Sequence, residues 1–168
     1  YVHYVANFGA TSVVVRTNDA FRPDAEAVAD AITPRTRAVI VNSPSNPTGV
    51  VYPAEDFEAL GAVLEAASQE QGRPIALISD EPYREIRFTD EPFVSPAVLY
   101  EQSLIAYSFS KSHAIPGERI GYLALNPHCP EATKLIAALA LSNRILHGGE
   151  SERRDYLGFL AAGDSDYP

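Results

Sequence analysis

Five runs of apolar or β-branched residues predict strands along the chain. Residues 37–42 and 75–79 are almost continuously apolar, which is typical of strands covered on both faces in a parallel sheet. Residues 103–109 and 120–125 are further apolar runs that favour extended structure. Residues 12–17 form a shorter β-branched run closed by turn-forming residues, and we expect a strand there as well.

Segments with helical periodicity separate these strands. Apolar residues recur at helical spacing after Asp24, over residues 24–32, and again over residues 53–69, where Gly72 ends the pattern. Residues 130–144 carry an Ala- and Leu-rich helical pattern. Alternating strands and helices predict an α/β fold with three layers, α-β-α, around a mostly parallel sheet, although the last strands need not all be parallel.

Composition and charge narrow the class of protein. The chain has 168 residues, 46% of them hydrophobic, which is enough for the core of one ordinary domain. Its net charge of -9 argues against nucleic acid or an anionic membrane as partner. Cys129 is the only cysteine, so an intrachain disulfide and a Cys-rich metal site are excluded, and cytoplasmic localisation is the default expectation.

The segment around Lys111 carries the most distinctive chemistry. Lys111 follows a predicted strand, lies among Ser108, Ser110 and Ser112, and precedes Arg119 by eight residues. Partial burial and a neighbouring guanidinium favour the neutral amine, which is the form that attacks carbonyls. Hydroxyls and a guanidinium also suit a phosphate. The plain alternative is a strand that ends in a polar turn with a solvated lysine.

Two other polar groups follow predicted strand ends. Asn46 lies in the turn-rich residues 42–49, and Asp80 and Tyr83 follow the strand at residues 75–79. Open α/β sheets bind ligands just beyond the carboxyl ends of their strands, so one crevice could gather these groups with Lys111. Taken singly, residues 42–49 could be a mere connector, Asp80 a cap or turn residue, and Tyr83 a half-buried core aromatic.

Together these groups match the needs of a pyridine aldehyde cofactor. Such a cofactor needs a carboxylate at its ring nitrogen, donors near its phenolic oxygen, an amine for its aldehyde and partners for its phosphate. The chain resembles the fold-type I pyridoxal-phosphate aminotransferases, in the class I/II group that includes aspartate aminotransferases, over roughly residues 1–146. The resemblance rests on three motifs and their order: Asn46-Pro47-Thr48-Gly49, Asp80-Glu81-Pro82-Tyr83, and Ser108-Phe109-Ser110-Lys111 with Arg119 and Gly121-Tyr122.

The resemblance implies a role for each matched residue. Lys111 would form the Schiff base with the cofactor and move a proton as general base. Asp80 would pair with the pyridine nitrogen, and Asn46 and Tyr83 would hydrogen-bond the phenolic oxygen. The phosphate of pyridoxal 5'-phosphate would be bound by Ser108, Ser110 and Arg119. Glu81 is expected to be a supporting salt-bridge partner, and His113 a local packing or hydrogen-bonding residue.

The resemblance also predicts what the chain lacks. It implies an incomplete large domain over residues 1–146, followed by a divergent and weakly packed tail at residues 147–168. A phosphate-binding loop and a ring-stacking aromatic are expected upstream of Tyr1, and an arginine for the substrate carboxylate is expected downstream. The absence of any methionine agrees with a piece cut from a longer polypeptide. The parent is expected to be a homodimer.

These observations favour an amino-acid aminotransferase that moves an amino group from an amino acid to a 2-oxo acid by a ping-pong mechanism. A carbon-sulfur lyase or an aminocyclopropane-carboxylate-synthase-like enzyme would use similar motifs. A degenerate, non-catalytic fragment is a further alternative. An unrelated doubly wound domain with another phosphorylated ligand also remains open at this point.

Overall fold

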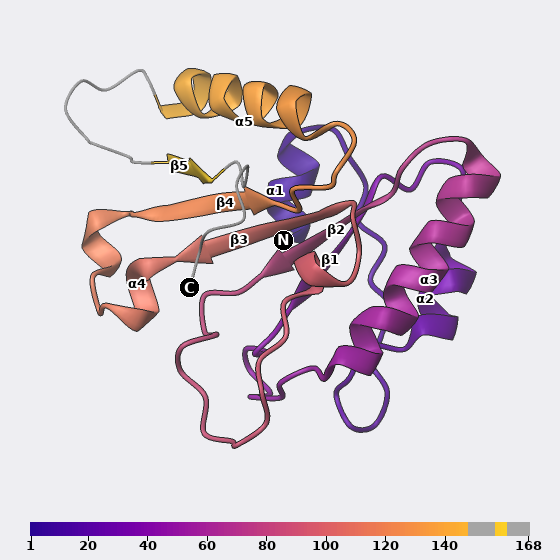
Figure 1. The fold of residues 1–168 in the computed structure, drawn as a ribbon, viewed down its shortest axis with the longest axis horizontal. Helices are drawn as coiled ribbons and strands as arrows, with labels where there is room; N and C mark the ends of the chain where they lie inside the picture. The colour runs from indigo at the N-terminus through magenta and orange to yellow at the C-terminus, as the bar shows by residue number, and fades with distance from the viewer. Residues whose placement is uncertain (148–156, 161–168) are drawn as a thin grey trace.

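The computed structural model describes residues 1–147 and 157–160 (Figure 1). In these residues the chain alternates between helices and strands, as the sequence pattern predicts. The elements, in chain order, are α1 (Val2–Asn7), α2 (Ala25–Ala31), β1 (Ala38–Asn42), α3 (Ala54–Gln71), β2 (Ala76–Asp80), the 3-10 turn η1 (Pro96–Val98), β3 (Ser103–Ser108), α4 (Phe109–Ser112), the 3-10 turn η2 (Pro116–Glu118), β4 (Gly121–Leu125), α5 (Ala132–His147) and β5 (Leu157–Leu160).

The strands form one sheet in the order β1-β2-β3-β4-β5. β1 pairs with β2 in parallel and ends with Asn42 opposite Asp80, and β2 pairs with β3 in parallel. β3 and β4 are antiparallel, with Ser108 opposite Gly121, and β4 pairs with β5 in parallel. The α/β class and the mostly parallel sheet are confirmed. The antiparallel pair places the start of β4 beside the end of β3.

Local sequence explains where the helices begin and end. The carboxylate of Asp24 accepts a hydrogen bond from the amide of Ala27 at 3.0 Å and so caps α2. α3 ends at Gly72, which adopts the left-handed conformation that glycine tolerates best. Arg22 reaches across to the first turn of α3 and makes a two-pronged contact with Asp56, at 2.6 and 2.7 Å. The Arg22–Asp56 contact ties the segment before α2 to α3, and the two helices lie side by side (Figure 1).

The main core lies between α3 and the β1-β2 pair. Phe57, Leu60 and Leu64 from α3 are fully buried, together with Ile75 and Leu77 from the β2 segment. Full burial of such a side chain contributes roughly 1.5–3 kcal/mol each. Tyr100 closes this core, and its hydroxyl donates to the carbonyl of Ile75 at 2.7 Å. This core fixes β1 and β2, and the candidate residues Asn46, Asp80 and Tyr83 lie at or just beyond the ends of these two strands.

The strand expected at residues 12–17 is not formed, and that prediction was wrong. The backbone there has no regular structure, and the side chains of Val13 and Val14 are 69% and 77% exposed. A β-branched run becomes a strand only where a neighbouring strand pairs with it, and no strand among the described residues lies against it.

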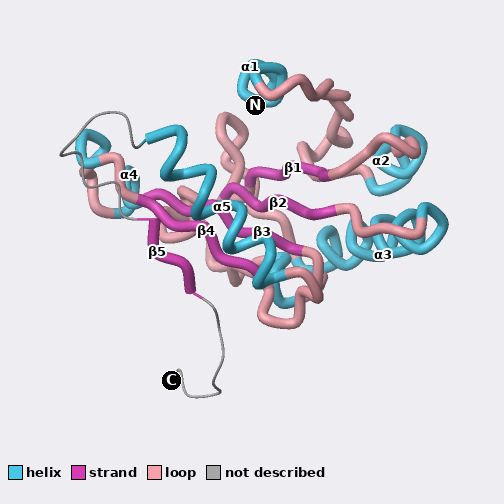
Figure 2. Tube along the Cα trace, turned by 90° about the horizontal axis from the view of Figure 1, so that it is seen from above, coloured by secondary structure: helices cyan, strands magenta, loops and turns pink. Residues whose placement is uncertain are grey.

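Helix α1 was not predicted from the sequence. It lies on the β1 side of the sheet (Figure 2).

The tail expected at residues 147–168 falls almost entirely outside the described residues. Only His147 and the backbone of β5 belong to the part that is described.

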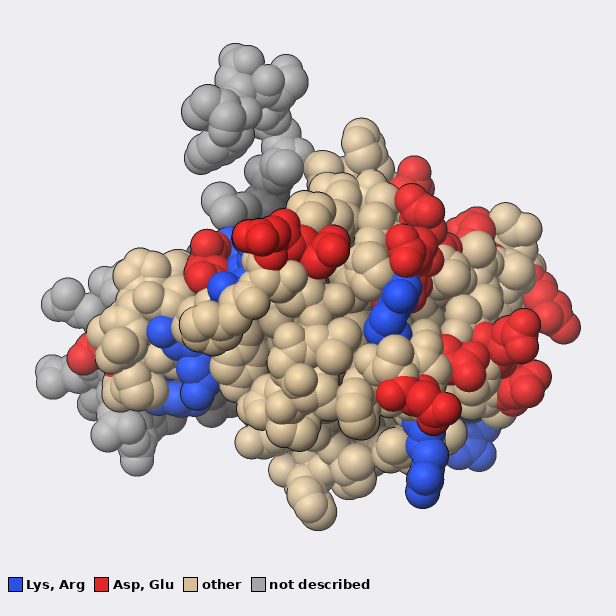
Figure 3. Space-filling model, turned by 90° about the horizontal axis from the view of Figure 1, so that it is seen from below, with Lys and Arg blue, Asp and Glu red and all other residues tan. Residues whose placement is uncertain are grey.

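Among all the described residues, no helix is both long and apolar enough to cross a membrane. Acidic side chains spread widely over the face drawn in Figure 3, with basic side chains in smaller groups between them, in keeping with the net charge of -9.

Candidate active site

The ends of β1 and β2 are joined by a side chain that organises the following loop. Asn42 donates from Nδ2 to the carbonyl of Asp80 at 2.9 Å, and its Oδ1 accepts from the amide of Asn46 at 2.8 Å. One side chain thus ties the strand end that carries Asp80 to the loop that carries Asn46. This geometry places Asp80 and Asn46 at the same edge of the sheet.

Three of the candidate residues meet at this edge. Asn46 donates from Nδ2 to the hydroxyl oxygen of Tyr83 at 2.9 Å. The Nζ atom of Lys111 lies 5.7 Å from the centre of the Tyr83 ring, within the range of a cation-π contact. Residues from three separate segments therefore converge, although the side chain of Lys111 is exposed and lacks the burial expected from the sequence.

The two candidate serines form a turn at the start of α4. Ser108 caps this short helix, because its Oγ accepts from the amide of Ser110 at 3.2 Å and donates to the hydroxyl of Ser110 at 2.8 Å. Lys111 follows within the same turn of helix. The two hydroxyls are therefore adjacent to the amine.

Arg119 is the candidate that the structure does not join to the others. It adopts a left-handed backbone conformation, with φ of 53°, at the end of η2. Its Nη1 atom donates to the carbonyl of Pro116 at 3.1 Å. Among the described contacts of Arg119, none reaches Ser108 or Ser110.

Tyr1 contacts the site, and no motif in the sequence pointed to it. Its hydroxyl donates to the Oδ2 atom of Asp80, which lies 79 residues away in the chain. Partial burial, the carboxylate of Asp80 and the nearby Tyr83 all raise the pKa of Tyr1 above its ordinary value. No local motif marks a tyrosine for such a contact, because the partner comes from a distant strand.

A buried carboxylate, Glu81, follows directly after β2 and is the neighbour of Asp80 in the chain. Glu81 is fully buried, accepts a hydrogen bond from Ser95 at 2.7 Å, and lies 3.8 Å from the guanidinium of Arg84. Burial raises the pKa of Glu81, while the hydroxyls of Ser95 and Ser79 and the charge of Arg84 oppose that rise. The ion pair expected for Glu81 is thus made with Arg84.

Arg84 connects this carboxylate to the strands that carry the lysine segment. Its guanidinium lies 4.3 Å from the ring centre of Tyr107 on β3 and 5.7 Å from that of Tyr122 on β4. These two rings stack with their centres 5.0 Å apart. Tyr107 also donates to Ser112 at 2.7 Å, so the end of β3 is braced against α4. His113 contacts Ser112 and the Phe109 ring, a local packing role as expected.

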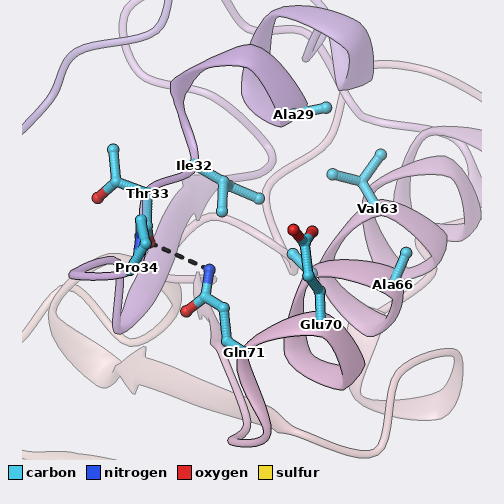
Figure 4. Close-up of a pocket in the computed structure, with 9 residues that line it drawn as sticks. Ala29, Ile32, Thr33, Pro34, Val63, Ala66, Glu70 and Gln71 are labelled. Atoms are coloured by element: carbon cyan, nitrogen blue, oxygen red, sulfur yellow. Dashed lines mark hydrogen bonds between the residues drawn. The ribbon is translucent and has the colours of Figure 1, made fainter.

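A separate groove of about 360 Å³ lies between α2 and α3 (Figure 4). Its walls are mainly apolar, and Gln71 bridges it by donating to the carbonyl of Thr33 at 3.1 Å. None of the candidate residues lines this groove. The candidate site is therefore the open edge at the strand ends.

A comparison with known families identifies the family of the chain. The family model described as aminotransferase class I and II matches residues 1–148. The chain belongs to this family. The match extends over every candidate residue named above.

Individual relatives give the same result. An arginine-pyruvate transaminase of Pseudomonas aeruginosa is 43% identical over 131 residues, which cover 73% of this chain and 32% of that protein. An aspartate aminotransferase of Geobacillus stearothermophilus is 40% identical over 127 residues, which cover 73% of this chain and 31% of that protein. The chain therefore spans about a third of the length of these relatives.

Solved structures are similar to this chain in fold as well as in sequence. An aminotransferase from Eubacterium rectale superimposes with a TM-score of 0.84 at 40% identity, over 88% of this chain and 37% of that one. An aspartate aminotransferase from Thermus thermophilus, crystallised with maleate, gives a TM-score of 0.62 at 40% identity, over 71% of this chain and 30% of that one. The chain thus corresponds to a part of the aminotransferase large domain.

Proposed function

We propose that this chain is the central part of a pyridoxal-phosphate-dependent amino-acid aminotransferase. The reaction would move an amino group from an amino acid to a 2-oxo acid in two half-reactions. The observation that carries the proposal is the meeting of Asn46, Tyr83 and Lys111 beside Asp80. This arrangement provides an amine, a carboxylate and two hydrogen-bonding groups at one sheet edge.

The donor set fits pyridoxal 5'-phosphate. When bound, the cofactor supplies the electron sink that stabilises charge at the substrate α-carbon. The carboxylate of Asp80 would hold the protonated pyridine nitrogen, because an ionised partner at hydrogen-bond distance favours the charged form of the ring. The amide of Asn46 and the hydroxyl of Tyr83, already 2.9 Å apart, would donate to the phenolic oxygen.

The phosphate would lie against the start of α4. Ser108 and Ser110 offer two hydroxyls and the amide of Ser110 within one turn. Arg119 would contribute a guanidinium after it exchanges its contact with the Pro116 carbonyl for the phosphate, a stronger acceptor.

Lys111 would perform the covalent and proton-transfer steps. Its exposed amine would be the nucleophile for the aldehyde of the cofactor, and the same amine would hold a proton beside the substrate α-carbon. Positioning of the amine by α4 and by the Tyr83 ring would lower the entropic cost of these steps.

The partners follow from this reaction class. The substrates would be two small molecules, an amino acid and a 2-oxo acid, and the full protein is proposed to act as a homodimer in the cytoplasm. Residues 1–146 would form the partial cofactor-binding domain and residues 147–168 a divergent C-terminal segment, of which the β5 backbone pairs with β4. The relatives are named for different amino acids, arginine and aspartate among them, so the proposal stops at the substrate class.

The decisive experiment uses the fact that the chain contains two lysines, Lys111 and Lys134. The purified chain is mixed with pyridoxal 5'-phosphate, reduced with borohydride, digested and mapped by mass spectrometry. We expect the label on Lys111 and its loss in Lys111→Arg. Lys134 is exposed and paired with Glu131 at 2.8 Å, so Lys134→Arg is the matched control and should leave the label unchanged. Equal labelling of both lysines would refute the proposal.

A further inference from the structure

The contact between Tyr1 and Asp80 concerns the carboxylate on which cofactor binding would depend. The phenol of Tyr1 donates to Oδ2 of Asp80 from the residue that precedes α1. Figure 2 shows the N-terminus and α1 on the β1 side of the sheet. Two segments far apart in the sequence are thus joined at the candidate site.

The shape and chemistry of this contact resemble those of a bound pyridine. Tyr1 presents a planar six-membered ring whose polar tip is an O–H donor to the Asp80 carboxylate. A protonated pyridine would present a planar six-membered ring whose tip is an N–H donor to the same carboxylate. The two rings therefore compete for one acceptor and for the space in front of it.

The surroundings keep Tyr1 in its donor form. Partial burial, Asp80 and Tyr83 raise its pKa, so the phenol retains its proton over the neutral range. Tyr1 nevertheless remains 57% exposed and belongs to no buried core cluster, so it can turn away without unpacking a core. A protonated but exposed phenol can hold the carboxylate and can also release it.

We propose that Tyr1 occupies the position of the pyridine ring in the cofactor-free chain and is displaced when pyridoxal 5'-phosphate binds. The inference rests on the proposed function, and it adds that a side chain of the chain itself, Tyr1, competes with the cofactor for Asp80. It assigns to Tyr1 the role of a hydrogen-bond donor that competes with the cofactor for the Asp80 carboxylate. Removal of the phenolic hydroxyl alone would then favour the cofactor.

The test compares Tyr1→Phe with Tyr4→Phe. Tyr4 lies three residues further on, within α1, and is 76% exposed, so its substitution is a matched control. The affinity for pyridoxal 5'-phosphate is measured from the absorbance of the chromophore. We expect Tyr1→Phe to lower the dissociation constant about fivefold, the effect of removing one competing hydrogen bond, and Tyr4→Phe to leave it unchanged. In an Asp80→Ala background the gain from Tyr1→Phe should vanish, because the contested acceptor is gone.

A second measurement tests the contact without any cofactor. The chain is prepared with ring-labelled tyrosine, the Tyr1 resonance is assigned from Tyr1→Phe, and its phenol is titrated by NMR. We expect a pKa above the ordinary tyrosine value that falls in Asp80→Ala. An unshifted phenol, or a Tyr1→Phe chain that binds the cofactor no more tightly than wild type, would refute the role of Tyr1.

The two proposals fail in different ways. If the cofactor labels Lys111 but Tyr1→Phe has no effect, the proposed function stands and the role of Tyr1 is wrong. If Lys111 takes no label with either residue at position 1, the proposed function is wrong. The displacement of Tyr1 is then refuted as well, even where the NMR titration detects its contact with Asp80.

Discussion

The hydrogen bond of 2.9 Å from Asn46 to Tyr83 joins two loops that are 37 residues apart in the sequence. Asn46 is itself fixed by its amide, which donates to Asn42 at the end of β1. Tyr83 follows the end of β2 and lies under the amine of Lys111. The pair therefore forms a preorganised edge before any ligand arrives, and preorganisation reduces the cost of binding.

The first prediction concerns this pair. Asn46→Ala and Tyr83→Phe should each weaken the binding of pyridoxal 5'-phosphate by about 1 kcal/mol, or roughly fivefold, because each removes one donor to the ligand. The double variant should lose less than the sum, because either single change also breaks the Asn46-Tyr83 bond. Absorbance titrations of the four proteins measure this coupling. Strict additivity would show that the two side chains act independently.

The second prediction distinguishes residues that bind the phosphate of the cofactor from residues that bind its pyridine ring. Ser110→Ala should weaken the binding of pyridoxal 5'-phosphate several-fold, because a hydroxyl bond to an anion is lost, and leave the weaker binding of pyridoxal unchanged. Arg119→Ala should behave in the same way if the guanidinium leaves Pro116 for the phosphate. Competition assays with both ligands provide the measurement. An equal loss for both ligands would place these residues elsewhere than at the phosphate.

Much of this site follows from the sequence because its parts are local to strand ends. The apolar run of β2 fixes Asp80 at a strand end, and the serines after β3 form a turn by hydrogen bonds to one another. Such features depend on neighbours within a few residues, so pattern and turn chemistry predict them well. The groups in these turns then meet because parallel strands end at the same edge.

The features that the sequence did not reveal depend on distant partners. The contact of Tyr1 with Asp80 spans 79 residues and has no signature around Tyr1. Residues 12–17 have the composition of a strand but gain no pairing from the described sheet. The side-chain direction of Arg119 follows from its left-handed backbone after η2. Periodicity carries no information on any of these three relationships.

The third prediction uses the pH dependence of stability. Burial raises the pKa of Glu81 above its ordinary value of 4.5. A raised folded-state pKa means that the folded chain binds a proton more tightly than the unfolded chain. The stabilising contribution is therefore complete below the unfolded pKa and is lost as the pH rises through the folded pKa.

Glu81→Gln should remove this dependence. Urea unfolding of wild type should show a fall in the free energy of unfolding as the pH rises from 4.5 through the raised pKa, a fall that Glu81→Gln lacks. Glu85→Gln is the control, because Glu85 is 56% exposed and lies beside the same arginine, Arg84. If both variants follow the wild-type curve, Glu81 is not the group that titrates.

The fourth prediction concerns the close approach of β3 and β4 at Gly121. A Cβ atom at this position would lie 2.4 Å from the carbonyl oxygen of Tyr107, and backbone cannot yield as a flexible side chain does. Gly121→Ala should therefore push the strands apart where Ser108 pairs with Gly121. We expect a loss of about 1–3 kcal/mol in the free energy of unfolding, together with weaker cofactor binding because Ser108 is displaced.

Gly117→Ala is the control for that experiment. Gly117 lies in the neighbouring turn η2, and a Cβ atom there would meet no atom within 4 Å. Urea unfolding should therefore change little for Gly117→Ala and markedly for Gly121→Ala. Equal stability of the two variants would show that β3 and β4 can separate at Ser108 at little cost. The hydroxyl of Ser108 would then be held by its bond to Ser110 rather than by the pairing of the two strands.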